Sequence, residues 1–178
     1  MLTTRDLMVI DFLKQYKVAT TSTIQQLFYP SQRVCQNRLK AMIESKKIKR
    51  MRNYLNKEYI YYISMPKQFK HSLYVTEFYR DFSRKYKIEM FRLEMQLDDI
   101  RPDAFIAYSD HGKAQIAFLE VEISNKGFNY NKYEKFYSTE SYKKWFPFMP
   151  TVFIVGNLPK LNEKCRVKYI YYPLKLKI

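Results

Sequence analysis

Side chains that can read the edges of DNA bases recur at helical spacing in the first third of the chain. They stand at i, i+3, i+4, i+7 and i+11 and are Arg33, Gln36, Asn37, Lys40 and Glu44. On a helix, residues at this spacing share one side. The forked groups of Arg, Asn and Gln match guanine and adenine edges in the major groove. The pattern therefore predicts a helix face that contacts duplex DNA.

A basic run follows this face, where contacts to DNA phosphates are expected. It consists of Lys46, Lys47, Lys49, Arg50 and Arg52. Residues 31–52 hold eight Lys and Arg against Glu44 alone, and the whole chain has a net charge of +15. Such a density of positive charge favours a polyanionic partner. The alternative is an ordinary solvated, basic helix face without a nucleic-acid ligand.

The elements that position this face follow from apolar periodicity and capping residues. Ser31 follows Pro30 and can cap a helix whose opposite side carries Cys35, Leu39 and Met42. Two alternating, Tyr- and Ile-rich segments with a short connection at 55–57 then predict a β-hairpin. The predicted helices cover about 4–17, 21–28 and 32–46, and the predicted strands cover 48–54 and 58–63. Three helices followed by a hairpin predict a winged helix-turn-helix domain over residues 1–64.

The pattern changes after residues 65–67, which predicts a second domain over 65–178. The expected order is helix, three strands, helix, strand and a last strand, over about 70–86, 88–96, 103–108, 114–124, 129–146, 151–156 and 166–172. This succession is typical of an α+β or α/β domain built on a central sheet. The fold class of the whole chain is therefore expected to be α+β.

Three carboxylates of this second domain have a spacing suited to metal binding. Glu120 and Glu122 are two apart on a predicted strand, so they project to one face, and Asp103 opens a neighbouring strand. Convergence of the three would give the oxygen ligands that Mg²⁺ prefers. The alternative is that the carboxylates form salt bridges, for instance with Arg101 or Lys126.

The arrangement resembles the PD-(D/E)xK nuclease core, an αβββαβ fold in which Asp, Glu and Lys surround a metal-activated water. Pro102-Asp103 matches the first motif, Glu120 the following acid, and Glu77 the preceding acid. Glu122 stands where that family usually has Lys, and Lys126 or Lys132 are the substitutes available. The resemblance implies either a Mg²⁺-dependent nuclease with Asp103 and Glu120 as metal ligands, or a degenerate domain that only binds.

Several short motifs are also similar to those of the replication-relaxation family. They are His71-Ser72-Leu73, Arg101-Pro102-Asp103-Ala104, Leu119-Glu120-Val121-Glu122, and Asn131-Lys132-Tyr133 with Tyr137. That family belongs to plasmids and mobile elements, and its members also begin with a winged helix. The resemblance implies a role in replication, its control or transfer, with replication or transfer proteins as partners. A transcriptional regulator with a C-terminal dimerisation module is the alternative.

Composition narrows the remaining classes. Three glycines in the whole chain argue against glycine-rich phosphate loops. No apolar run reaches the length of a membrane span, and the first residues do not resemble a signal peptide, so a cytoplasmic protein is expected. Cys35 and Cys165 have no zinc-like spacing.

The stripe formed by Tyr130, Tyr133, Phe136 and Tyr137 is expected in the core, with base stacking as its alternative. Residues 169–172 are expected to form an edge strand that a homodimer would use.

Overall fold

The computed structural model describes residues 1–53, 58–124, 127–156 and 165–172. The chain forms two compact units, the first of which comprises Met1–Asp81, while the second begins at Phe82. Within the described residues there are five α-helices, one 3-10 helix and two sheets, so the expected α+β class is confirmed. The first unit reaches beyond the boundary expected near residue 65, because side chains of the fourth helix contact the first and second helices.

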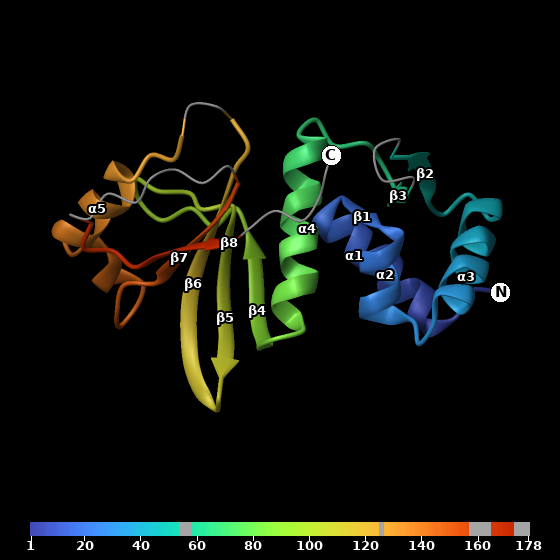
Figure 1. Cartoon of the computed structure of the whole chain (residues 1–178), viewed down its shortest axis with the longest axis horizontal. Coiled ribbons are helices and arrows are strands. Elements are labelled where there is room, and N and C mark those ends of the chain that lie inside the picture. Colours follow the sequence, from blue (N-terminus) through green and yellow to red (C-terminus); the bar gives the residue numbers. More distant parts are fainter. Residues whose placement is uncertain (54–57, 125–126, 157–164, 173–178) are drawn as a thin grey trace. The chain divides into compact units, whose positions relative to one another are not determined.

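The first unit contains three helices, most of a fourth and a small antiparallel sheet (Figure 1). Its elements are α1 (Thr4–Tyr16), β1 (Val18–Thr20), α2 (Thr21–Phe28), α3 (Gln32–Glu44), β2 (Lys49–Arg52) and β3 (Tyr59–Tyr62), followed by α4 (Phe69–Ser83). The sheet order is β1-β3-β2. The three helices and both hairpin strands were predicted from the sequence, whereas the strand β1 was not. All three residues of β1 are buried, so no alternation marks it as a strand.

Side-chain caps fix where the first three helices begin. Thr3 and Asp6 form a capping box at the start of α1, in which each side chain bonds the other residue's backbone N–H. The Thr20 hydroxyl accepts from the backbone N–H of Thr23 at the start of α2. Ser31 caps α3 by accepting from the backbone N–H of Val34, as its position after Pro30 predicted. These caps satisfy backbone donors that otherwise have no partner within the helix.

Asp6 is the buried polar centre of the three-helix packing. Its side chain has no exposed surface, yet it accepts from the Tyr29 hydroxyl at 2.7 Å and from Arg38 Nε at 3.1 Å. A second guanidinium nitrogen of Arg38 completes an ion pair with it. Burial by itself would raise the pKa of Asp6, but Arg38, Thr3 and Tyr29 together hold it well below the usual range. One carboxylate thus joins α1, the end of α2 and α3.

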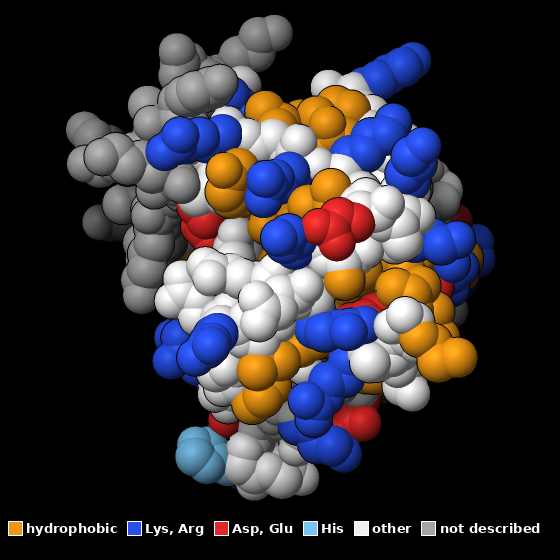
Figure 2. All heavy atoms as spheres, turned by 90° about the vertical axis from the view of Figure 1, so that its right-hand side faces the viewer, with side chains coloured by type: hydrophobic (Ala, Val, Ile, Leu, Met, Phe, Trp, Pro, Cys, Tyr) orange, Lys and Arg blue, Asp and Glu red, His pale blue; other side chains and the backbone are white. Residues whose placement is uncertain are grey.

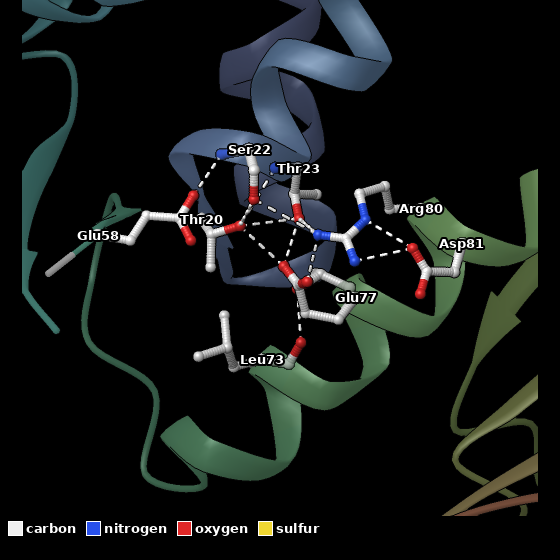
Figure 3. A network of polar contacts seen from close by, with 9 residues as sticks. Thr20, Ser22, Thr23, Glu58, Leu73, Glu77, Arg80 and Asp81 are labelled. Carbon is white, nitrogen blue, oxygen red and sulfur yellow. Dashed lines mark hydrogen bonds and ion pairs between the residues drawn. The ribbon is translucent and has the colours of Figure 1, made fainter. Parts of the chain in front are cut away.

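A second buried network joins α2 to α4 (Figure 3). The carboxylate of Glu77 on α4 accepts from the hydroxyls of Thr20, at 2.8 Å, and Thr23. Arg80, one turn later, pairs with the other oxygen of Glu77 and with Asp81 at 2.8 Å. Buried polar groups persist only where such partners are present. The network accounts for the inclusion of residues up to Asp81 in the first unit.

The second unit contains a five-stranded mixed sheet, counted over the described residues (Figure 1). Its elements are β4 (Lys87–Leu93), β5 (Ala104–Asp110), β6 (Lys113–Glu122), α5 (Asn131–Ser138), η1 (Ser141–Lys144), β7 (Thr151–Gly156) and β8 (Tyr169–Tyr172). The strand order is β4-β5-β6-β7-β8. The pairs β4-β5 and β5-β6 are antiparallel, whereas the pairs β6-β7 and β7-β8 are parallel. The turn between β5 and β6 is tight, and His111 and Gly112 both have positive φ.

One face of this sheet is covered by α5, which brings Tyr133 and Phe136 onto Phe118, Val152 and Ile154. Tyr133 and Phe136 are fully buried, so these two aromatic residues are core residues, as the sequence favoured. The expected continuous helix over 129–146 is wrong. It ends at Ser138, Glu140 adopts the left-handed conformation, and η1 follows. At this end of the helix, the hydroxyls of Ser138 and Thr139 both donate to the Lys135 carbonyl, which also accepts from the backbone N–H of Thr139.

Asp6→Asn is expected to destabilise the first unit by roughly 3 kcal/mol at neutral pH, because it breaks a buried ion pair. Asp11→Asn is the matched control on the same helix, since Asp11 is exposed and its ion pair is with exposed Lys14. Its effect should stay within about 0.5 kcal/mol. Urea unfolding followed by circular dichroism measures both. Equal effects of the two variants would contradict the role given to Asp6.

The ion pair between Asp6 and Arg38 predicts that the stability of the first unit depends on pH. The folded-state pKa of Asp6 lies below its unfolded value, so its contribution is complete above about pH 4 and is lost as the pH falls toward the folded value. The stability difference between wild type and Asp6→Asn should therefore narrow on acidification. A difference that widens as the pH falls would show that the pKa shift has the opposite sign.

Candidate nucleic-acid interface

The helix α3 has one buried and one exposed side. Cys35, Leu39 and Met42 are at most 1% exposed and hold the helix in the core of the first unit. The four side chains expected to face bases are all exposed, and they are Arg33, Gln36, Asn37 and Lys40. Lys40 lies 3.8 Å from Glu44, an exposed i,i+4 pair that leaves both side chains solvated. The structure therefore places the predicted polar face on the surface.

Arg38 differs from the other basic residues of α3. Its guanidinium pairs with buried Asp6 and donates to the Met1 carbonyl at 3.1 Å. It therefore belongs to the helix packing and not to the exposed face, although sequence reasoning counted it with the basic surface. The sequence around Arg38, which directly follows Asn37, does not reveal this packing role, because the role depends on Asp6, a partner 32 residues away.

The basic run begins where α3 ends. Lys46 adopts the left-handed conformation, and the backbone N–H groups of Lys46 and Lys47 bond the carbonyls of Ile43 and Met42. This pair of bonds is a Schellman motif, which satisfies carbonyls at the end of the helix. Lysines near a helix C-terminus also interact favourably with its dipole. The motif turns the chain directly from α3 into β2.

On β2 the basic side chains are exposed. Lys49, Arg50 and Arg52 are solvent-exposed, while Ile48, just before the strand, is buried. The guanidinium carbon of Arg50 lies 4.3 Å from the ring centre of Tyr59 on β3, a cation-π contact between the two hairpin strands. The backbone N–H of Asn53 donates to the Glu58 carbonyl at 2.7 Å and closes the described part of the hairpin. The predicted connection at 55–57 lies outside the described residues.

Together α3 and β2 give this side of the first unit a basic surface. Figure 2 looks onto the side that carries α3 and shows Lys and Arg side chains spread over it, with few Asp and Glu side chains between them. A hollow of about 490 Å³ adjoins the first half of α3 and is lined by Gln25, Gln32 and Gln36 together with Ser22, Glu58 and Tyr59. Sequence reasoning did not single out Gln25 or Gln32, because a glutamine on a helix has no distinctive spacing.

The second unit brings two of its three predicted carboxylates together. Asp103 precedes β5 and, by continuing the register of β5 and β6, faces Glu120. Asp103 Oδ2 accepts from the backbone N–H of Val121 at 2.7 Å. Glu120 Oε1 accepts from Lys132 Nζ at 2.7 Å and from the Tyr133 hydroxyl. The predicted substitute Lys132 on α5 is thus paired with Glu120.

The electrostatics of this cluster follow from its burial. Burial raises the pKa of Glu120, and the negative charge of Asp103 adds to the increase, while Lys132 and Tyr133 oppose it. Burial and the Glu120 carboxylate raise the pKa of Tyr133 well above its ordinary value, so it remains a hydrogen-bond donor. These side chains form a hydrogen-bonded polar centre beneath α5.

The cluster does not fit a ready-made metal site. Glu120 already has a cation and a hydroxyl as partners, and Glu122 Oε1 accepts from the backbone and hydroxyl of Ser124. Among the described residues, no group of three or more His, Cys, Asp or Glu side chains is placed to hold a metal ion. Glu77 lies in the first unit, bonded to Thr20 and Thr23, and Lys126 lies outside the described residues.

Comparison with known proteins gives no relative: no family model, no curated protein and no solved structure matches this chain. A search of the described helices finds none that is both long and apolar enough to cross a membrane.

Arg38→Ala and Arg33→Ala distinguish the two kinds of arginine on α3. Arg38→Ala should destabilise the first unit clearly, because it leaves the buried charge of Asp6 without its cation. Arg33→Ala removes the same side chain from an exposed position and should change stability by less than about 0.5 kcal/mol. Thermal and urea unfolding of both variants provide the test. A larger loss for Arg33→Ala would contradict the assignment.

The acidic cluster predicts the outcome of a nuclease assay. Because Glu120 is paired with Lys132, we expect supercoiled plasmid to stay intact when it is incubated with the protein and Mg²⁺ or Mn²⁺. Asp103→Asn is the control for any residual nicking, since a contaminating nuclease is insensitive to it. Metal-dependent nicking by wild type that Asp103→Asn abolishes would overturn this expectation and establish the nuclease implied by the PD-(D/E)xK resemblance.

Proposed function

We propose that the first unit is a winged helix-turn-helix domain that binds duplex DNA, with α3 in the major groove. The observation that carries the proposal is the division of α3 into a buried side and an exposed side bearing Arg33, Gln36 and Asn37. These side chains have the donor and acceptor groups that discriminate base pairs in the major groove. A recognition helix needs such a face directed away from the core that holds it.

The hairpin of β2 and β3 is the proposed wing. Its exposed cations, Lys49, Arg50 and Arg52, are suited to phosphate oxygens, which fix the register of a protein on DNA without reading sequence. Lys46 and Lys47 extend the same basic surface toward the end of α3. The contact between Arg50 and Tyr59 restrains one of these cations, so less side-chain entropy is lost when it meets a phosphate.

For the second unit we propose a nuclease-like αβββαβ scaffold that serves binding and not metal chemistry. Support comes from its mixed sheet with α5 on one face and from the pairing of Glu120 with Lys132. The short motifs shared with the replication-relaxation family support a role in plasmid or mobile-element replication, its control or transfer. Replication or transfer proteins are the corresponding partners. A homodimer formed along the edge strand β8 would instead support a transcriptional regulator.

Measurements of duplex DNA binding should distinguish the contribution of the wing from that of α3. The triple variant Lys47→Ala, Lys49→Ala and Arg52→Ala removes two cations of the wing and the adjoining Lys47, and it should weaken binding to every duplex. It should also reduce the slope of log affinity against log salt by about 0.9 for each phosphate that the protein no longer neutralises. Gln36→Ala and Asn37→Ala should leave binding to random duplex nearly unchanged. Fluorescence anisotropy with labelled duplex over a range of salt concentrations measures both quantities.

Lys14→Ala is the matched control for charge, because Lys14 is an exposed lysine of the same unit, on α1, paired with Asp11. Its salt slope should equal that of wild type. A salt slope that is unaffected by the wing substitutions, or one that Lys14→Ala reduces equally, would reject the proposed interface.

A further inference from the structure

The second unit has a hollow that neither the proposed DNA interface nor the acidic cluster uses. It has a volume of about 500 Å³ and lies on the sheet face opposite α5. Alternation along the strands places Tyr108 and Phe153 on this face, whereas Phe105 and Val152 point to the core beneath α5. A volume of this size falls in the range of pockets for small organic ligands.

The inner wall of this pocket is aromatic. Phe82, which follows the first unit directly, packs edge-on against Tyr108 and Phe153, with ring centres 4.9 and 5.3 Å apart. Tyr86 lies 5.1 Å from Tyr108 and is only half-buried. Tyr172 on β8 is also half-buried and lines the pocket from the strand side. Tyr86 is thus held by a packed aromatic cluster, and Tyr172 adds a second half-buried ring to the lining.

Two cations, Lys85 and Lys168, line the pocket. Lys85 follows α4 and its Nζ lies 5.6 Å from the ring centre of Tyr172. Lys168 directly precedes β8, and both lysine side chains are exposed. The pocket also has the carboxylate of Asp110 and the amide of Gln115 among its lining groups. Aromatic surface, positive charge and neutral hydrogen-bonding groups therefore occur in one concave site.

We propose that this pocket binds a nucleotide, with the base against the tyrosine rings and the phosphate between Lys85 and Lys168. Stacking on aromatic side chains is the general mode by which proteins hold unpaired bases, since every base offers a flat π-face. The lysines supply the opposite charge for the phosphate. Gln115 and Asp110 can bond the edge of the base or the sugar hydroxyls.

Two kinds of ligand carry both a base and a phosphate that would fit this pocket. One is a free mononucleotide, and the other is an unpaired nucleotide of a DNA or RNA single strand. Isolated apolar ligands would leave Lys85 and Lys168 unused, and simple anions would leave the aromatic wall unused. The inference does not rest on duplex binding by α3, because all the residues that carry it belong to the second unit.

Isothermal titration calorimetry with the full chain tests this proposal. The probes are adenosine and guanosine 5′-monophosphate, ribose 5-phosphate, adenosine, and a short single-stranded oligonucleotide. The nucleoside monophosphates should bind about tenfold more tightly than ribose 5-phosphate, because only they have a base to stack. The oligonucleotide arm identifies the source: tighter binding of the strand assigns the pocket to single-stranded nucleic acid, and tighter binding of the monophosphate assigns it to a free nucleotide.

Variants then place the ligand in this pocket. The double variant Lys85→Ala and Lys168→Ala should weaken nucleoside monophosphate binding by about tenfold and leave adenosine binding unchanged. Tyr172→Phe should preserve binding, whereas Tyr172→Ala should weaken it for every probe that has a base. Lys143→Ala is the matched control, because Lys143 is an exposed lysine of the same unit paired with Glu140.

Three results would overturn the proposal, the third of which concerns Arg33→Ala. One is the absence of binding by every nucleotide probe to a correctly folded protein. Another is binding that the double lysine variant and Tyr172→Ala leave unchanged, which would place the nucleotide elsewhere. Since Arg33→Ala should not affect mononucleotide binding, a loss caused by that variant would likewise assign the nucleotide to α3.

Discussion

The packing of the first unit depends on a buried carboxylate that has no access to solvent. Asp6 lies at the start of α1, and its partners are Tyr29, just after α2, and Arg38 in the middle of α3. A buried charge without partners is strongly unfavourable, so the three helices are stable only in an arrangement that supplies these donors. This arrangement directs Cys35 and Leu39 inward and leaves Arg33 and Gln36 on the surface. The proposed DNA-reading face therefore follows from an interaction on another side of the same helix.

Carboxylates are used in the same way elsewhere in the chain. Glu77 is buried against Thr20, Thr23 and Arg80, and Glu120 is buried against Lys132 and Tyr133. Each of these acids is directed inward and paired, whereas most of the lysines and arginines between residues 31 and 52 remain exposed. Because these acidic side chains are buried, they do not offset the positive charge of the exposed surface in a chain whose net charge is +15. This division also separates the residues that maintain the fold from those available to a polyanionic partner.

The sequence predicted what depends on local patterns and left out what depends on distant partners. The Ser31 cap, the apolar stripe of α3 and the alternation of β2 and β3 are local signals, and the corresponding elements are present. The strand β1 was missed because three consecutive buried residues have no periodicity. The end of α5 was placed too late because the apolar spacing in the sequence continues past Ser138, where the helix ends.

In the candidate sites, too, the sequence predicted features that depend on local spacing and missed those that depend on distant partners. Exposure of Arg33, Gln36 and Asn37 follows from helix geometry, so it was predictable. The structural role of Arg38, the pairing of Glu120 with Lys132 and the aromatic pocket around Tyr108 join residues from separate elements. Spacing along the chain carries no information on such contacts, and only the packing of the elements reveals them.

Reading of base edges by α3 is tested most directly by selection from a pool of randomised duplex DNA. The duplexes retained by wild type and by the double variant Gln36→Ala and Asn37→Ala are sequenced and compared. We expect wild type to enrich one short sequence, and the variant to lose the preference at one or a few adjacent positions while keeping the rest. Enrichment of no sequence by wild type, or of the same sequence by both proteins, would contradict base reading by this helix.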